Sequence, residues 1–233
     1  MSMISSRGLI RARNLTRKLG INSFIGKLVA DKNYEDKFGK AIQKQIQTGD
    51  IVWDVGANLG VYTQRFLQFV GETGRVVAFE PIPDCFSQLN KDLGTSPQVI
   101  LKNVAMGEED GVICMAVDNN PLAATHRVVE GSQNSLGSIM EVSIVSAQTV
   151  VATEPNLFPN IIKIDVEGHE GSVISGLEKL LQDKRLRCVG VEVHFGLLNE
   201  RGESNCPQLI QTTFEQNGFN VRWTDFSHML ALR

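Results

Sequence analysis

Two acidic residues occupy positions where strands of this sequence are expected to end. Asp54 closes the apolar run at 51–53, and Glu80 closes a second apolar run at 76–79. Glu80 follows the turn after Asp54 by about 20 residues, a spacing at which an acid accepts hydrogen bonds from both hydroxyls of a ribose. This spacing predicts the binding of an adenosine-like ligand.

The segment between these acids contains a glycine turn, Gly56-Ala57-Asn58-Leu59-Gly60, between a predicted strand and a predicted helix. Glycines let the backbone approach a ligand closely, and the N–H groups at a helix start attract a negatively charged group. A dinucleotide would need space for its pyrophosphate, which Leu59 and Val61 are expected to crowd. S-adenosylmethionine has adenine and ribose but no phosphate, so it fits this turn better.

We expect the cofactor site to combine this turn with residues at the ends of neighbouring strands. Asp54 would lie under the turn and bond backbone N–H groups or the ammonium group of the ligand. Asn103, after the strand expected at 99–101, would read the adenine edge or serve only as a turn residue. The full set is Asp54, Gly56, Ala57, Asn58, Gly60, Thr63, Glu80, Pro81, Asn103, Val104, Ala105 and Asp165.

Candidates for a general base lie at the ends of two later strands. If a methyl group of such a ligand were transferred to an aliphatic hydroxyl, a base would be needed, because the hydroxyl is a poor nucleophile unless its proton leaves as the new bond forms. Asp165 ends the apolar run 161–164, and Glu192 and His194 end the run 187–194. We assign His194 as the base because imidazole titrates near neutrality, and Glu192 or Asp165 as the group that orients it.

The residues that follow Asp165 have simpler interpretations. Glu167 and Glu170 stand at the start of an expected helix, where the helix dipole favours acids, and His169 is expected to be exposed there. In an alternative, two histidines and several carboxylates hold a divalent ion that activates a hydroxyl. The four cysteines show neither a CxxC pair nor metal-ligand spacing, and we assign no metal ligand.

The elements that must position these side chains alternate between strand and helix. This order predicts an α/β fold with an open, mostly parallel sheet and helices on both faces, in which ligands bind at the carboxyl ends of the strands. Residues 34–233 are expected to form this domain. Strands at 112–117 and 140–145 flank a long polar loop, so we expect a substrate-side insertion near 112–146.

The first 33 residues differ from the rest in charge and are expected to form a basic helical arm. Such an arm could pack on the domain or contact an anionic membrane surface. The net charge of −3 gives no argument for nucleic acid binding, and the scattered cysteines indicate reduced thiols and a cytoplasmic location. Residues 1–30 contain no acid, and their bases are Arg7, Arg11, Arg13, Arg17, Lys18 and Lys27.

Three stretches of the chain together resemble a known family. They are residues 52–60, the triplet Phe79-Glu80-Pro81, and the run Ile162-Lys163-Ile164-Asp165-Val166-Glu167-Gly168-His169-Glu170 with Gly176 after it. The chain from about residue 35 onward is similar to the FkbM family of S-adenosylmethionine-dependent methyltransferases. The resemblance implies a class I methyltransferase fold, which is Rossmann-like with an antiparallel last strand. It also implies O-methylation of a hydroxyl on a sugar, glycoconjugate or secondary metabolite.

Other functions stay open at this point. N-methylation and metal-assisted O-methylation would use the same fold and a small-molecule or glycan acceptor. A nicotinamide-dependent oxidoreductase predicts a GxGxxG turn, which this sequence lacks. A binding module without catalysis predicts loss of the cofactor acids, but Asp54, Glu80 and Asp165 are all present.

Overall fold

The computed structural model describes residues 34–118, 127–128 and 137–233, and its main feature is a seven-stranded sheet. The strands have the order β10-β11-β9-β8-β1-β2-β3, and β11 is antiparallel to both of its neighbours. The predicted α/β fold, mostly parallel with an antiparallel last strand, is confirmed. The strands are β1 (Ile51–Val55), β2 (Arg75–Phe79), β3 (Val99–Lys102), β8 (Ile161–Ile164), β9 (Cys188–Glu192), β10 (Asn220–Trp223) and β11 (His228–Leu232).

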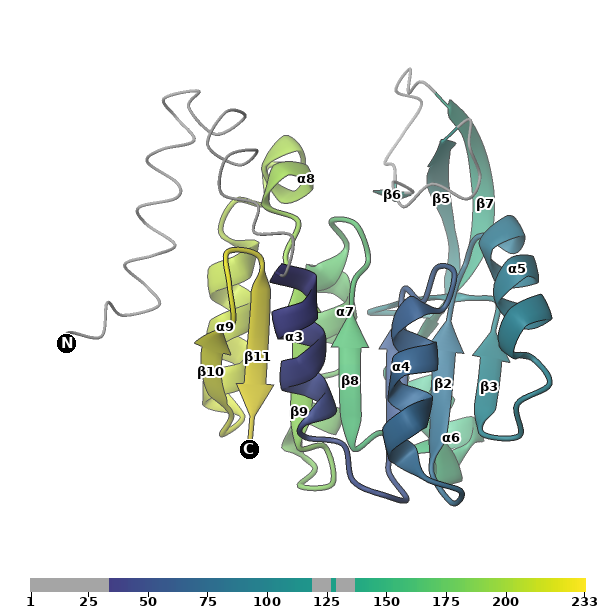
Figure 1. Cartoon of the computed structure of the whole chain (residues 1–233). Coiled ribbons are helices and arrows are strands. Elements are labelled where there is room, and N and C mark those ends of the chain that lie inside the picture. Colours follow the sequence, from purple (N-terminus) through teal and green to yellow (C-terminus); the bar gives the residue numbers. More distant parts are fainter. Residues whose placement is uncertain (1–33, 119–126, 129–136) are drawn as a thin grey trace.

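Helices cover both faces of this sheet, as the alternating pattern predicted (Figure 1). They are α3 (Tyr34–Gln43), α4 (Val61–Val70), α5 (Pro83–Leu93), α6 (Ala147–Thr153), α7 (Glu170–Gly176), α8 (Phe195–Glu200) and α9 (Cys206–Gln216). On one face, Phe38 of α3 and Phe66 of α4 belong to the same buried cluster as Val52 of β1. On the other face, α6, α7 and α9 contribute to a larger buried cluster. Burial of these apolar side chains from water on both faces stabilises the layered fold.

A second, four-stranded sheet lies beside the carboxyl edge of the main sheet, with the order β4-β7-β5-β6. Figure 1 shows β5 and β7 rising above the ends of the parallel strands. The two strands expected here are confirmed and are longer than predicted, whereas β4 and β6 were not predicted. The strands are β4 (Ala105–Gly107), β5 (Gly111–Asp118), β6 (Arg127–Val128) and β7 (Gly137–Ser146).

Several element boundaries differ from the sequence-based prediction. The helix expected to begin near Glu167 begins at Glu170 as α7, ends at Gly176 and is followed by a 3-10 turn, Leu180–Gln182. Helix α8 was not predicted, because its six residues are too few to show a helical period. The basic arm at 1–33 lies outside the described residues. In the described part, no helix is both long and apolar enough to cross a bilayer.

Candidate active site

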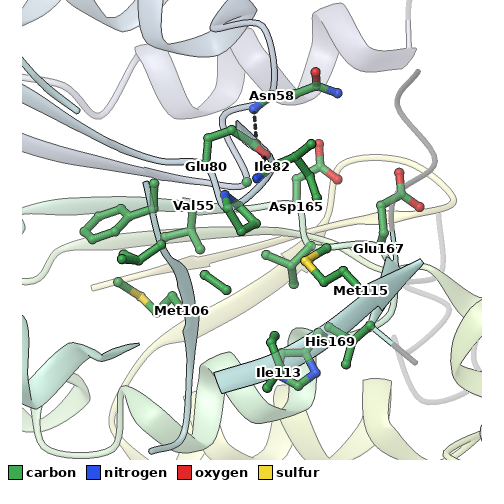
Figure 2. Close-up of a pocket in the computed structure, with 17 residues that line it drawn as sticks. Val55, Asn58, Glu80, Ile82, Met106, Ile113, Met115, Asp165, Glu167 and His169 are labelled. Carbon is green, nitrogen blue, oxygen red and sulfur yellow. Dashed lines mark hydrogen bonds between the residues drawn. The ribbon is translucent and has the colours of Figure 1, made fainter. Parts of the chain in front are cut away.

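A pocket with about 700 Å³ of empty space, part of which is open solvent, lies where β1, β2 and β8 end beneath the second sheet. In Figure 2, Glu80 and Asn58 lie toward one side of it and Ile113 and Met115 of β5 toward the other. The pocket therefore has a polar wall from the main sheet and an apolar wall from the insertion. It is lined by Val55, Gly56, Asn58, Phe79, Glu80, Pro81, Ile82, Val104, Ala105, Met106, Ile113, Met115, Val128, Asp165, Val166, Glu167 and His169.

The glycine turn follows β1, as predicted. Glycine is required there because neighbouring protein atoms approach the turn closely. Gly56 and Gly60 have φ values of 75° and 80°, which disfavour other residues. A Cβ atom on Gly56 would lie 1.8 Å from the carbonyl oxygen of Asp165, and one on Gly60 would lie 2.4 Å from Leu89. These glycines thus allow the turn to pack against the Asp165 backbone and against α5.

Glu80 is 4% exposed and lines the pocket at the end of β2. One carboxylate oxygen accepts the N–H of Asn58 at 2.7 Å, and the other accepts the N–H of Ile82 at 2.8 Å. Burial raises the pKa of Glu80 to about 7, although these two hydrogen bonds lower it. Each oxygen keeps a further lone pair, so the carboxylate can also accept hydrogen bonds from two ribose hydroxyls.

Several other residues that were expected to bind the cofactor lie outside the pocket lining. Asp54 is fully buried; one carboxylate oxygen accepts the hydroxyl of Thr63 at 2.6 Å and the other faces Lys163, in place of the turn N–H groups or ligand ammonium expected for it. Asn103 donates its amide N–H to the carbonyls of Glu80 and Pro81, which favours the turn-residue interpretation over adenine reading. The expected residues that do not line the pocket are Asp54, Ala57, Gly60, Thr63 and Asn103.

Lys163 is a buried cation that was not predicted to be a site residue. Its Nζ lies 3.2 Å from Oδ1 of Asp54 and 3.4 Å from Oδ2 of Asp165, and it donates to the Gly56 carbonyl at 3.1 Å. Burial lowers the pKa of Lys163, but the two carboxylates outweigh this and raise it above its usual value. A lysine in an otherwise apolar, buried strand needs such partners. Its place in that strand was therefore the sequence signal that could have identified Lys163 as a site residue.

His194 occupies the N-cap position of α8 and lies next to the acids of the β8 loop rather than in the pocket lining. Its Nδ1 lies 2.6 Å from Oε1 of Glu170, and its Nε2 lies 3.3 Å from Glu167 and 3.7 Å from Asp165. Burial lowers the pKa of His194, but the hydrogen bond and the neighbouring acids raise it to about 9. Burial raises the pKa of Glu167 to about 7.

The structure corrects the expectation that Glu192 orients His194. Strand β9 ends at Glu192, whose carboxylate lies 3.3 Å from Nε2 of His228, the residue opposite it on β11. Beyond the strand end the side chains no longer alternate, so His194 meets Glu170 instead. Glu170 still acts at the start of α7 by accepting the N–H of Gly168. It therefore both stabilises the turn that precedes α7 and holds His194, without capping the N–H groups of the helix.

His169 also departs from expectation, because it is half-buried and lines the pocket instead of being exposed. The apolar residues Met106, Ile113 and Met115 were missed as site residues. They belong to β4 and β5, and only the folding of the second sheet over the main sheet brings them to the pocket. A strand pattern alone gives no sign of this placement.

The residues of the pocket match the parts of S-adenosylmethionine. Glu80 offers two acceptor oxygens for the ribose, and the apolar wall offers contacts for adenine. Oδ1 of Asn58 is buried and makes no hydrogen bond to the described residues, so it is an acceptor available to a ligand. The site therefore fits this cofactor.

The sheet order and an acid after β2 that faces the pocket define a class I S-adenosylmethionine-dependent methyltransferase domain. The chain belongs to the FkbM methyltransferase family: residues 54–232 match the family described as Methyltransferase FkbM domain. S-adenosylmethionine is accordingly its cofactor.

Known proteins similar to this chain include two methyltransferases. The hexuronic acid methyltransferase AglP of Haloferax volcanii is 30% identical over 173 residues, 72% of this chain and 66% of that protein. Methyltransferase 1 of Beauveria bassiana is 25% identical over 143 residues, 54% of this chain and 57% of that protein. In both cases the chain spans less than two thirds of the relative's length.

The crystal structure of an FkbM methyltransferase from Methylobacillus flagellatus shares the fold. It superposes on 84% of this chain and 50% of its own with a TM-score of 0.51, at 12% sequence identity. At this identity the similarity supports the fold alone.

Proposed function

We propose that this protein transfers the methyl group of S-adenosylmethionine to a hydroxyl group of a sugar or glycoconjugate. The observation that carries the proposal is that a single pocket joins the cofactor acid Glu80 to Asp165 and Glu167. The similarity to a hexuronic acid methyltransferase favours a sugar acid as the acceptor.

Different residues of the described part of the chain have different roles in this reaction. When bound, S-adenosylmethionine supplies a methyl carbon that is electrophilic because it is attached to a sulfonium. Glu80 binds the ribose, and the wall formed by Ile113 and Met115 excludes water from the reacting groups. As the new C–O bond forms, the proton of the acceptor hydroxyl leaves to one acceptor, either a carboxylate oxygen of Asp165 or Glu167 or Nε2 of His194 in its neutral form.

The test uses purified protein, S-adenosylmethionine with an isotopically labelled methyl group, and three acceptors. These are a glucuronic acid glycoside, a neutral hexose glycoside and an amino sugar glycoside. We expect label in the first acceptor, in a product that survives mild alkali because it is an ether. Release of labelled methanol by alkali would place the methyl on the carboxylate, and label on the amine would identify an N-methyltransferase. Either outcome, or no labelled sugar, would overturn the proposal.

A further inference from the structure

The carboxylates of Asp165 and Glu167 and the Nε2 atom of His194 converge beside the pocket. One ligand atom from each residue lies within 4.8 Å of the other two. We infer that this cluster binds a divalent metal ion. Two carboxylates and one imidazole suit a first-row divalent ion such as Mn²⁺ or Zn²⁺ better than Mg²⁺ or Ca²⁺, which prefer oxygen ligands, and Mn²⁺ is a suitable probe of such a site.

The separations within the cluster suit ligands of one ion better than hydrogen-bond partners. Nε2 of His194 lies 3.3 Å from Oε2 of Glu167 and 3.7 Å from Oδ1 of Asp165. A charge-assisted N–H···O bond is usually about 2.7–2.9 Å long. Neighbouring ligands of an octahedral ion with bonds of about 2.2 Å lie about 3.1 Å apart. Small side-chain adjustments would therefore bring the three atoms to an ion.

A second observation concerns the other ring nitrogen of His194. Nδ1 lies 2.6 Å from Oε1 of Glu170, a carboxylate that is fully buried and is also bonded by the N–H of Gly168. Histidine ligands of metal ions commonly donate their second N–H to a carboxylate in this way, which turns the lone pair of the opposite nitrogen toward the metal. In this arrangement Nε2 of His194 is directed toward Asp165 and Glu167, where a metal ion could take the place of its proton.

The charges around the cluster also favour a bound cation. Within the described residues, the ion pairs of Asp165 are with Lys163 and His194, and that of Glu167 is with His194. Lys163 is also engaged by Asp54 and by the Gly56 carbonyl. The carboxylates of Asp165 and Glu167 therefore both face Nε2 of His194, and without a metal ion a proton on this nitrogen balances their charge. A metal ion bound between the three atoms would displace that proton and neutralise the same carboxylates.

The role of the ion rests on the proposed function, whereas its binding does not. A cation at this position would lower the pKa of an acceptor hydroxyl placed beside it and would attract the carboxylate of a sugar acid. Because the ligand lone pairs would then be engaged, the hydroxyl proton would leave to water. This arrangement also explains how an acidic site could accept an anionic sugar.

The test titrates Mn²⁺ into the purified full-length protein and follows free Mn²⁺ by electron paramagnetic resonance, without cofactor or acceptor. We expect one bound ion per chain. Glu167→Gln and His194→Ala should each weaken binding at least tenfold, and Glu170→Gln should weaken it by about 10–100-fold through His194. The matched control is Asp225→Asn, which removes a carboxylate from the separate histidine cluster around His228 and should leave binding unchanged.

Thermal unfolding and cofactor affinity confirm that each variant is folded. No binding at millimolar Mn²⁺, or equal binding by wild type, Glu167→Gln and His194→Ala, would overturn the metal site and leave a protonated His194 as the cation. A protein that binds Mn²⁺ at this cluster but methylates no sugar would keep the site and overturn the proposed function. If the protein methylates a sugar but binds no Mn²⁺, the proposed function stands and the metal site is overturned.

Discussion

Nζ of Lys163 lies 3.2 Å from Oδ1 of Asp54, and neither side chain is more than 2% exposed. The pair fixes β8 to β1 directly beneath the glycine turn, because Lys163 also donates to the carbonyl of Gly56. Removing one member of a buried pair leaves the other charge without compensation, which is more costly than losing an exposed pair.

Lys163→Met should therefore lower the free energy of unfolding by about 3–5 kcal/mol and weaken cofactor binding. The matched control is Lys102→Met, which removes the cation of the more exposed pair with Glu154 and should cost no more than about 1 kcal/mol. Urea unfolding and calorimetric titration with S-adenosylmethionine measure the two effects. Equal losses in both variants would show that the buried pair does not organise the turn.

Gly56→Ala should be far more damaging than the same change at Gly202. The two glycines have φ values of 75° and 76°, so both substitutions carry a comparable left-handed strain of about 1–2 kcal/mol. Only at Gly56 would the new Cβ meet another atom, the Asp165 carbonyl, since nothing lies within 4 Å of a Cβ at Gly202. Cofactor affinity should fall sharply in Gly56→Ala alone, and similar affinities would contradict the packing role of this glycine.

Cofactor affinity should increase as the pH is raised through 7. The pKa of Glu80 is about 7 instead of its usual 4.5 because the carboxyl is buried. Ribose hydroxyls donate to the ionised form, whose fraction rises about tenfold between pH 6 and pH 8. Calorimetric titration across this range should show a comparable gain. In Glu80→Gln the affinity should be low, and its remaining pH dependence should be smaller.

The same pKa shift has the opposite effect on the stability of the unliganded protein. Since the folded-state pKa is above the usual value, folding favours protonated Glu80, and the stability that this group contributes is complete below pH 4.5 and lost as the pH rises through 7. Wild type should therefore lose stability over this interval relative to Glu80→Gln. A constant difference between them in urea unfolding would contradict the raised pKa.

Replacement of His194 should impair turnover without impairing cofactor binding. His194→Ala should reduce kcat by about 10²–10⁴-fold, since it removes a proton acceptor or metal ligand beside the pocket, whereas Glu80, the cofactor acid, is untouched. Glu170→Gln should also reduce kcat, because Glu170 holds Nδ1 of His194. Steady-state assays and calorimetry separate the two effects.

Glu192→Gln is the informative comparison for the orienting role. Its carboxylate contacts His228 rather than His194, so its effect on kcat should be smaller than that of Glu170→Gln. If Glu192→Gln were the more damaging variant, the assignment of Glu170 as the residue that orients His194 would be wrong.

The sequence by itself determined the fold class and the polar wall of the pocket. Apolar runs that end in Asp54, Glu80 and Asp165 mark strands, and parallel strands bring their carboxyl ends to one edge. These signals are local, because each acid follows its own strand directly. The family resemblance followed from the same stretches and was confirmed over residues 54–232.

Only the tertiary structure decided which side chains meet. Glu170 and His194 are 24 positions apart, and their contact depends on where the loop after β8 lies relative to the start of α8. Glu192 reaches His228 because β11 pairs antiparallel with β9 in that register. The apolar wall likewise exists only because the second sheet folds over the first. Strand periodicity predicts the face of a side chain but not the segment that lies opposite it.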